Sequence, residues 1–163
     1  MGRIADRLLE LGITLPPSPP PAGAYLPYVR HNDLVQLAGV APRREGEKGY
    51  AYMGKIGRER TVEEGIDGAR LCCLSLLANL AAACGGDLDR VRRIMMVRGY
   101  VNAVETFEEV PKIVNGASEL FIKVFGEKVG AHARTSIGCG TLPSQVTVEV
   151  DALVVVDATG LTT

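Results

Sequence analysis

One segment constrains the fold of this chain more than any other: residues 61–86, which read TVEEGIDGARLCCLSLLANLAAACGG. Apolar side chains recur there at the spacing of one helix face, namely Val62, Ile66, Ala69, Cys73, Leu76, Leu77, Leu80 and Cys84. Thr61 and Glu64 have the spacing of a capping box, and Gly85-Gly86 supplies a stop. The segment predicts a long helix whose apolar face needs a second layer to cover it.

A second helix of the same design is predicted at 106–126, TFEEVPKIVNGASELFIKVFG. Thr106 with Glu109 can cap its start, and Gly126 ends it. Its apolar stripe consists of Phe107, Val110, Val114, Ala117, Phe121 and Val124. Pro111 would also permit a start one turn later, because proline is tolerated in the first turn of a helix.

Strands are predicted on both sides of each helix. Their expected ranges are 33–42, a second strand of a loose hairpin within YAYMGKI (50–56), 91–102, 133–140 and 145–156. The last two are joined through TLPS and are expected to pair. The order β-β-α-β-α-β-β predicts an α+β fold, a two-layer sandwich with both helices on one face of a mixed sheet.

The chain is expected to form one domain. Residues 1–21 combine a short amphipathic helix, with Ile4, Leu8 and Leu11 on one side, and the start of a proline-rich connector, LPPSPPPAG (15–23). The remaining residues, 22–163, are expected to form a single domain long enough to bury a substantial core.

Composition and charge exclude several classes of protein. The formal net charge is −1 and no lysine or arginine run exceeds two residues, so binding to nucleic acid is not expected. No uninterrupted apolar run approaches the length of about 18 residues that spans a membrane, and the charged N-terminus is unlike a signal peptide. We expect a cytoplasmic protein that does not enter a membrane.

The four cysteines do not form a metal motif. No C-x-x-C occurs, and His31 and His132 have no partner at zinc spacing, so buried reduced thiols and no metal are expected. Phosphate-binding, dinucleotide-binding and serine-nucleophile motifs are also missing from the sequence. An enzyme of this composition would have to bind an anion and position a water or a carboxylate.

Two charged residues near the C-terminus could serve such chemistry. Arg134, in HART, is either a solvated charge at a strand end or a planar cation that pairs with a ligand carboxylate. Glu149, in the strand expected to pair with that of Arg134, is either an outward-facing charge or the group that activates a water. The residue pattern alone leaves both alternatives open.

Three segments together resemble the Rid (YjgF) family. GAHARTSIGCGTLPSQVTVEVDAL resembles its C-terminal signature, in which an arginine begins a strand and an LP turn leads into a V-x-V-E strand. AGAYLPYVRHNDLVQLAGVAP resembles the opening of that family, and VNGASELF resembles the register of its second helix. The resemblance covers about residues 22–156.

The resemblance implies a chorismate-mutase-like fold that assembles as a homotrimer, with ligand clefts between subunits. It also implies hydrolysis of reactive enamine and imine intermediates to 2-oxo acids and ammonia, without a cofactor. The site residues that it implies are Arg134 as the carboxylate anchor, Glu149 beside the catalytic water, and Tyr25, Gly39, Asn115 and Ser136 as further contacts. Chemistry of this kind suits a chain poor in histidine, because an imine is already electrophilic.

The sequence also departs from the archetypal deaminases of that family. The N-terminal helix, the proline-rich segment and the 43–60 region lengthen the chain, and Ile-Gly-Cys-Gly follows the strand start at Arg134. These features favour an altered cleft. They support an alternative function, a non-catalytic member of the same fold that binds a carboxylated metabolite. The ribonuclease activity sometimes attached to the family name is disfavoured by the near-neutral charge.

Overall fold

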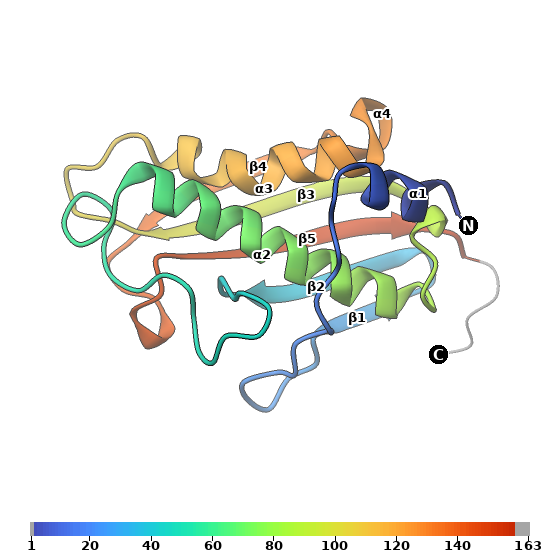
Figure 1. Cartoon of the computed structure of the whole chain (residues 1–163), viewed down its shortest axis with the longest axis horizontal. Helices are drawn as coiled ribbons and strands as arrows, with labels where there is room; N and C mark the ends of the chain where they lie inside the picture. Colours follow the sequence, from blue (N-terminus) through green and yellow to red (C-terminus); the bar gives the residue numbers. More distant parts are fainter. Residues whose placement is uncertain (1, 159–163) are drawn as a thin grey trace.

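The structure, a computed structural model, describes residues 2–158 and is built on a five-stranded sheet (Figure 1). The strands are β1 Tyr28–His31, β2 Leu34–Val40, β3 Val91–Asn102, β4 Ala133–Cys139 and β5 Val148–Val156. Their order is β1-β2-β5-β3-β4. All neighbours are antiparallel except β3 and β4, which run parallel. The predicted mixed sheet and α+β class are confirmed; the last five residues of the expected 22–163 domain, and Met1, lie outside the described residues.

Two long helices, α2 Val62–Ala83 and α3 Val110–Phe125, lie side by side over one face of this sheet (Figure 1). Four shorter helical segments complete the chain: α1 Arg3–Glu10, η1 Leu88–Arg90, α4 Glu127–Gly130 and η2 Pro143–Gln145. The predicted capping box of α2 is present, since Thr61 Oγ accepts from the Glu64 backbone N–H and Glu64 accepts from that of Thr61.

The predicted start of the second helix was wrong by one turn. α3 begins at Val110, and Glu109 at its N-cap makes no side-chain capping bond. Pro111 lies in the first turn, where its missing N–H costs nothing because that position has no helical acceptor. Proline therefore decided the boundary in place of the Thr106–Glu109 pair.

The predicted first hairpin was also wrong. β1 and β2 form the hairpin, turning at Asn32, whose φ of 55° suits the left-handed region that asparagine tolerates. Residues 50–56 contribute only isolated bridges, at Met53 and Ile56. Lys55 holds this region instead, because its Nζ donates to Asn102 Oδ1 at 2.8 Å and to the Gly140 carbonyl at 2.7 Å.

The last two strands do not pair with each other, contrary to expectation. β3 lies between β4 and β5, with Val97 opposite both Arg134 of β4 and Ala152 of β5. A two-residue hairpin cannot join strands that lie on either side of a third. Residues 140–147 make the crossing, with Ser144 and Gln145 at φ of 53° and 56°.

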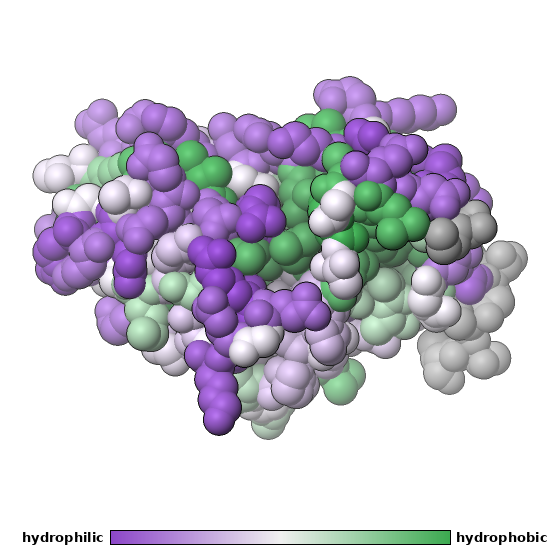
Figure 2. All heavy atoms as spheres, in the orientation of Figure 1, coloured by the Kyte–Doolittle hydropathy of each residue, from purple (hydrophilic) through white to green (hydrophobic). Residues whose placement is uncertain are grey.

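One helix bears on the expectation that the protein does not enter a membrane, which stays a prediction. α2 is long and apolar enough to cross a membrane by length and composition, with a mean hydropathy of 1.4 over the relevant stretch. However, 67% of that stretch is buried inside the fold, as in a core helix. In Figure 2 green apolar surface is visible only in part along the helix layer, between polar side chains.

The helix layer and the sheet share one core. Ile4 and Leu8 of α1 belong to it, as do the thiols of Cys72, Cys73 and Cys84, whereas Cys139 is only partly buried. Burial raises the pKa of the Cys72 and Cys73 thiols, which favours the neutral form.

The opposite side of the sheet, which we call the open face, carries no long helix. It bears Glu149, Asp151 and Leu153 of β5 and their neighbours on β3. Among its apolar side chains Val29, Leu34 and Ile137 are 57%, 42% and 48% exposed. This face is therefore available for contact with another protein surface.

Gly116 sets the approach of the two long helices and provides a test of the packing. A Cβ added there would lie 2.0 Å from the backbone oxygen of Ile66, which a helix cannot move without separating from its neighbour. We expect Gly116→Ala to lower the free energy of unfolding by about 2–3 kcal/mol, in spite of the better helix propensity of alanine. Thermal or urea unfolding measures this.

The matched control is Gly138→Ala in β4. A Cβ there would meet only Val110 Cγ2, at an ordinary 3.5 Å. The control should unfold within about 0.5 kcal/mol of the wild type. Equal stability of the two variants would contradict the proposed role of the Gly116 contact.

Candidate functional site

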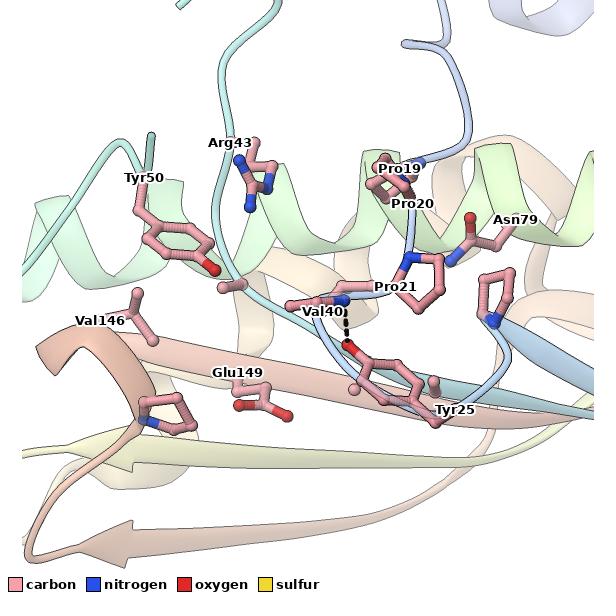
Figure 3. A pocket seen from close by; sticks show the side chains of 16 residues that line it. Pro19, Pro20, Pro21, Tyr25, Val40, Arg43, Tyr50, Asn79, Val146 and Glu149 are labelled. Atoms are coloured by element: carbon pink, nitrogen blue, oxygen red, sulfur yellow. Dashed lines mark hydrogen bonds between the residues drawn. The ribbon is translucent and has the colours of Figure 1, made fainter. Parts of the chain in front are cut away.

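Three of the predicted site residues, Tyr25, Gly39 and Glu149, line one cavity of about 450 Å³ (Figure 3). The cavity lies beside residues 38–41, at the C-terminal end of β2. This stretch extends beyond the start of β1, since Tyr28, the first residue of β1, pairs with Leu37. Prolines, alanines and valines form most of its wall. A concave apolar cavity with a few polar groups is the usual form of a small-molecule site.

Glu149 is the carboxylate of this cavity. It stands on the open face of β5, opposite Tyr100 of β3, and its side chain passes over Gly39. A Cβ at position 39 would lie 2.1 Å from Glu149 Oε1, so a glycine is needed for the carboxylate to rest there. The sequence predicted Gly39 and Glu149 as separate site residues. The structure shows that the missing side chain at Gly39 leaves the space that the Glu149 carboxylate occupies.

The environment of Glu149 favours its protonated form. Burial, and then the negative charge of Asp151, raise the pKa of the Glu149 carboxyl above its ordinary value. No residue of the described chain donates a hydrogen bond to it or forms an ion pair with it. A half-buried carboxyl with a raised pKa and free oxygens can accept and return a proton.

Tyr25 forms another wall together with the segment Pro19–Ala22, which we call the proline strap. The Tyr25 hydroxyl accepts a hydrogen bond of 3.1 Å from the Ala22 backbone N–H, shown dashed in Figure 3. Ser18 Oγ, just before the strap, donates to Asn79 Oδ1 of α2 at 2.6 Å. The proline-rich segment was predicted as a connector; it also forms part of the cavity.

The other predicted residues gather at β4. Arg134 points toward α3, where its Nη1 donates to Asn115 Oδ1 at 2.7 Å and to Ser118 Oγ at 3.2 Å. No carboxylate of the described chain pairs with this guanidinium. Ser136, two residues further along β4, has a buried hydroxyl without a hydrogen-bond partner in the described chain.

Sequence reasoning missed two residues of this second group, Ser118 and His132. His132 Nδ1 is 2.6 Å from the Gly130 carbonyl oxygen, which can only accept, so Nδ1 carries the proton and Nε2 is the acceptor. Ser118 Oγ, 2.9 Å from Nε2, donates to it and accepts from Arg134. A chain of hydrogen bonds therefore runs from the Gly130 carbonyl through His132 and Ser118 to Arg134, and we call it the relay. It orients the Arg134 guanidinium.

His132 is suited to this relay because its surroundings favour the neutral imidazole. Burial, and then the charges of Arg134 and Arg93, lower the pKa of the imidazole, while the bond to the Gly130 carbonyl opposes this. The ring of Phe121 packs edge-on against it at a centroid distance of 6.0 Å. The only signal in the sequence was position: Ser118 follows Asn115 by three residues, and His132 precedes Arg134 by two.

A single chain does not bring the two groups together. Arg134 lies on the helix side of the edge strand β4, in register with the fully buried Val97. Glu149 lies on the open face of β5, on the other side of β3. Among the described residues, no three histidine, cysteine, aspartate or glutamate side chains gather as a metal ion would require.

Comparison with known proteins gives a consistent result. The family described as "YjgF/chorismate mutase-like, putative endoribonuclease" matches residues 5–154. Protein TCP17 of Trypanosoma cruzi is 42% identical over 153 residues, which is 94% of each chain.

Solved structures of the same architecture agree. The protein Atu1372 of Agrobacterium tumefaciens, of unknown function, is 38% identical with a TM-score of 0.84, over 94% of this chain and 93% of that one. A protein from Shewanella oneidensis described as a "putative endoribonuclease" is 30% identical with a TM-score of 0.88, over 95% of this chain and 100% of that one. The family match at residues 5–154 includes the proline-rich segment and the 43–60 region as well as the core.

The relay makes a prediction about His132. Ser118→Ala should raise the pKa of the imidazole toward its ordinary value, because it removes the hydrogen bond that favours the neutral ring. The ring-proton signals followed by NMR during a pH titration report this, with His31 as the second histidine signal. Ser136→Ala, a neighbouring serine without a hydrogen bond, is the control and should leave the pKa of His132 unchanged. If the pKa of His132 is the same in Ser118→Ala as in the wild type, Ser118 does not donate to His132 and the relay is contradicted.

Proposed function

Because the chain belongs to the YjgF/chorismate mutase-like family, we propose that it is a hydrolase that deaminates reactive enamines and imines to 2-oxo acids and ammonia. The observation that carries the proposal is the state of Glu149. This carboxyl faces a cavity, is half-buried, has a raised pKa and has no partner in the described chain. Those are the properties of a group that exchanges protons with a water and a substrate.

The reaction needs little beyond positioning. The 2-imino acid carries an electrophilic C2, so a water held by Glu149 attacks C2 as the carboxylate accepts a proton from it. The C=N bond becomes a C–N bond, and Glu149 then returns the proton to nitrogen. The product of this addition carries a hydroxyl and an amino group on C2. Glu149 next accepts the hydroxyl proton and passes it to the amino nitrogen, so that the C–N bond breaks, ammonia leaves and the oxygen becomes the carbonyl of the 2-oxo acid. No electron acceptor is required, and the placement of water and imine supplies most of the acceleration.

Arg134 is proposed to bind the carboxylate of the substrate. Asn115 and Ser118 hold one end of its guanidinium, and the remaining N–H donors are free for two parallel bonds to a carboxylate. The resemblance adds Ser136 as a backbone contact to the ligand, and Tyr25 and Gly39 as further substrate-binding residues of the cleft. The orienting hydrogen bonds reduce the entropy lost when the substrate binds.

A complete site is proposed to require two copies of the chain. Arg134 and Glu149 lie on different faces of one sheet, so a neighbouring copy would supply one of the two groups. Exposed apolar side chains on the open face offer the contact surface for that copy. We propose a homotrimer, in which three such interfaces close around an axis.

A first test of this proposed function concerns Arg134 and Glu149. In a coupled assay, an amino-acid oxidase produces the imine and release of 2-oxo acid is followed. Arg134→Ala should abolish the added rate, with a loss of about 2–4 kcal/mol of binding, and Arg134→Lys should recover little because ammonium cannot form the planar pair. Glu149→Gln should keep binding of a 2-oxo acid but slow turnover at least tenfold.

Binding and folding measurements separate the alternatives. If wild-type protein binds 2-oxo acids but adds no rate, the chain is a non-catalytic binding member of its fold. If Arg134→Ala unfolds the protein or binds 2-oxo acids normally, the arginine is a structural charge. Cleavage of added RNA by wild-type protein, lost in Glu149→Gln, would instead support a ribonuclease.

A mixing experiment tests the shared site. Arg134→Ala and Glu149→Gln chains are co-expressed, so that mixed oligomers form. If each site combines Arg134 of one copy with Glu149 of the next, random trimers recover about a quarter of the wild-type number of complete sites. Light scattering on the same sample checks that the oligomer is a trimer. No recovery of activity in verified mixed trimers would place both residues in one chain, and a monomer would remove the shared cleft.

A further inference from the structure

The cavity contains a polar group that the proposed chemistry does not use, the amide of Asn79. It lies in the apolar part of α2 between Ala78 and Leu80, and the residue is only 1% exposed. Burying an amide is costly unless its donors and acceptors are satisfied. Asn79 Oδ1 accepts from Ser18 Oγ, but Nδ2 has no partner in the described chain.

The orientation of that amide is fixed from outside the cavity. The 2.6 Å bond from Ser18 holds the oxygen on the side of the proline strap. Figure 3 shows the Asn79 nitrogen turned toward Pro21 and the space that the strap encloses. The unpaired donor therefore faces the cavity, where a ligand oxygen would accept a hydrogen bond from it.

A second unused donor lies at the rim. Arg43 is the one cation among the described lining residues, as Glu149 is the one carboxylate. Its guanidinium stacks over the ring of Tyr50, 4.3 Å from the centroid, and Nη1 donates to the Gly49 carbonyl at 3.3 Å. No carboxylate of the described chain pairs with it.

Stacking on Tyr50 preorganises the Arg43 guanidinium for binding an anion. An arginine held flat on an aromatic ring keeps its charge and loses little freedom when it binds an oxyanion. Arg44, the next residue, has no such capacity, because Asp67 already pairs with it at 2.9 Å. Figure 3 shows Arg43 and Glu149 on different sides of the cavity.

We propose that this cavity selects 2-imino acids whose side chain ends in a second acidic group. With the reacting carbon beside Glu149, the side chain extends along the proline strap. Its terminal carboxylate then lies in the part of the cavity that contains the unused donors, Arg43 at the rim and Asn79 at the wall. The inference rests on the proposed function and adds the substrate class to it.

The selection follows from the unpaired donors. A substrate with an apolar side chain offers no acceptor to Asn79 Nδ2 and no anion to Arg43. A site built with hydrogen-bond donors discriminates strongly against ligands that cannot pair with them. The prolines favour this, because a stiff wall does not collapse onto a smaller or drier ligand.

The experiment compares imines made by amino-acid oxidases from glutamate and from norvaline, two substrates of similar length with and without the terminal carboxylate. Wild-type protein should prefer the glutamate-derived imine in kcat/KM by at least tenfold. Asn79→Leu and Arg43→Gln should each reduce that preference by about tenfold or more, through the acidic substrate alone. Arg58→Gln, an arginine of the same 43–60 region outside the cavity, is the matched control and should change neither rate.

Binding provides a readout that does not need turnover. By calorimetry, 2-oxoglutarate should bind more tightly than 2-oxopentanoate, and Arg43→Gln should remove most of the difference even if Asn79→Leu fails to fold. Hydrolysis of both imines at equal rates, with equal binding of the two 2-oxo acids, overturns the inference and leaves the proposed function intact. If neither imine is hydrolysed but the binding preference holds, the deaminase proposal fails and the acid-selective cavity stands.

Discussion

The close contact between the two long helices is the constraint on which the rest of the structure depends. Gly116 brings α3 so near to α2 that the Ile66 carbonyl occupies the space of a side chain. Gly99 does the same between sheet and helix, since a Cβ there would lie 2.4 Å from Val114 Cγ2. Two glycines thus press α3 against its neighbours, and a protein interior packed at this density leaves the helix no other position.

That position determines where the polar groups lie. α3 sits over β4 closely enough for Asn115 and Ser118 to reach Arg134, and the guanidinium is oriented on the helix side of the sheet. Glu149 belongs to the other face, where no long helix covers the strands and where Gly39 makes room for the carboxylate. Within one copy the two charges are therefore separated by the sheet itself and do not pair with each other.

Two segments that make this chain longer than the archetypal deaminases of the family, the 43–60 region and the proline strap, are held to the core by polar contacts. Lys55 fastens the 43–60 region to the end of β3, and the Tyr52 hydroxyl donates to Asp67 of α2 at 2.8 Å. The proline strap is tied to α2 through Ser18. Because both segments are held in this way, they act as fixed walls of the cavity: the 43–60 region presents Arg43 to it, and the strap lies against Asn79 of α2.

The sequence by itself determined the class of fold, the two helices, the 91–102 strand and the identity of the charged residues, because periodicity and caps are properties of adjacent residues. It misplaced the first hairpin and the start of α3, where Asn32 and Pro111 acted against the longer-range pattern. The pairing of β4 with β3, and with it the separation of Arg134 from Glu149, depended on tertiary structure alone. The same is true of Ser118, His132 and Asn79, whose roles arise from contacts between segments distant in the chain. Such contacts leave no period in the sequence, since they are selected by packing and not by local conformation.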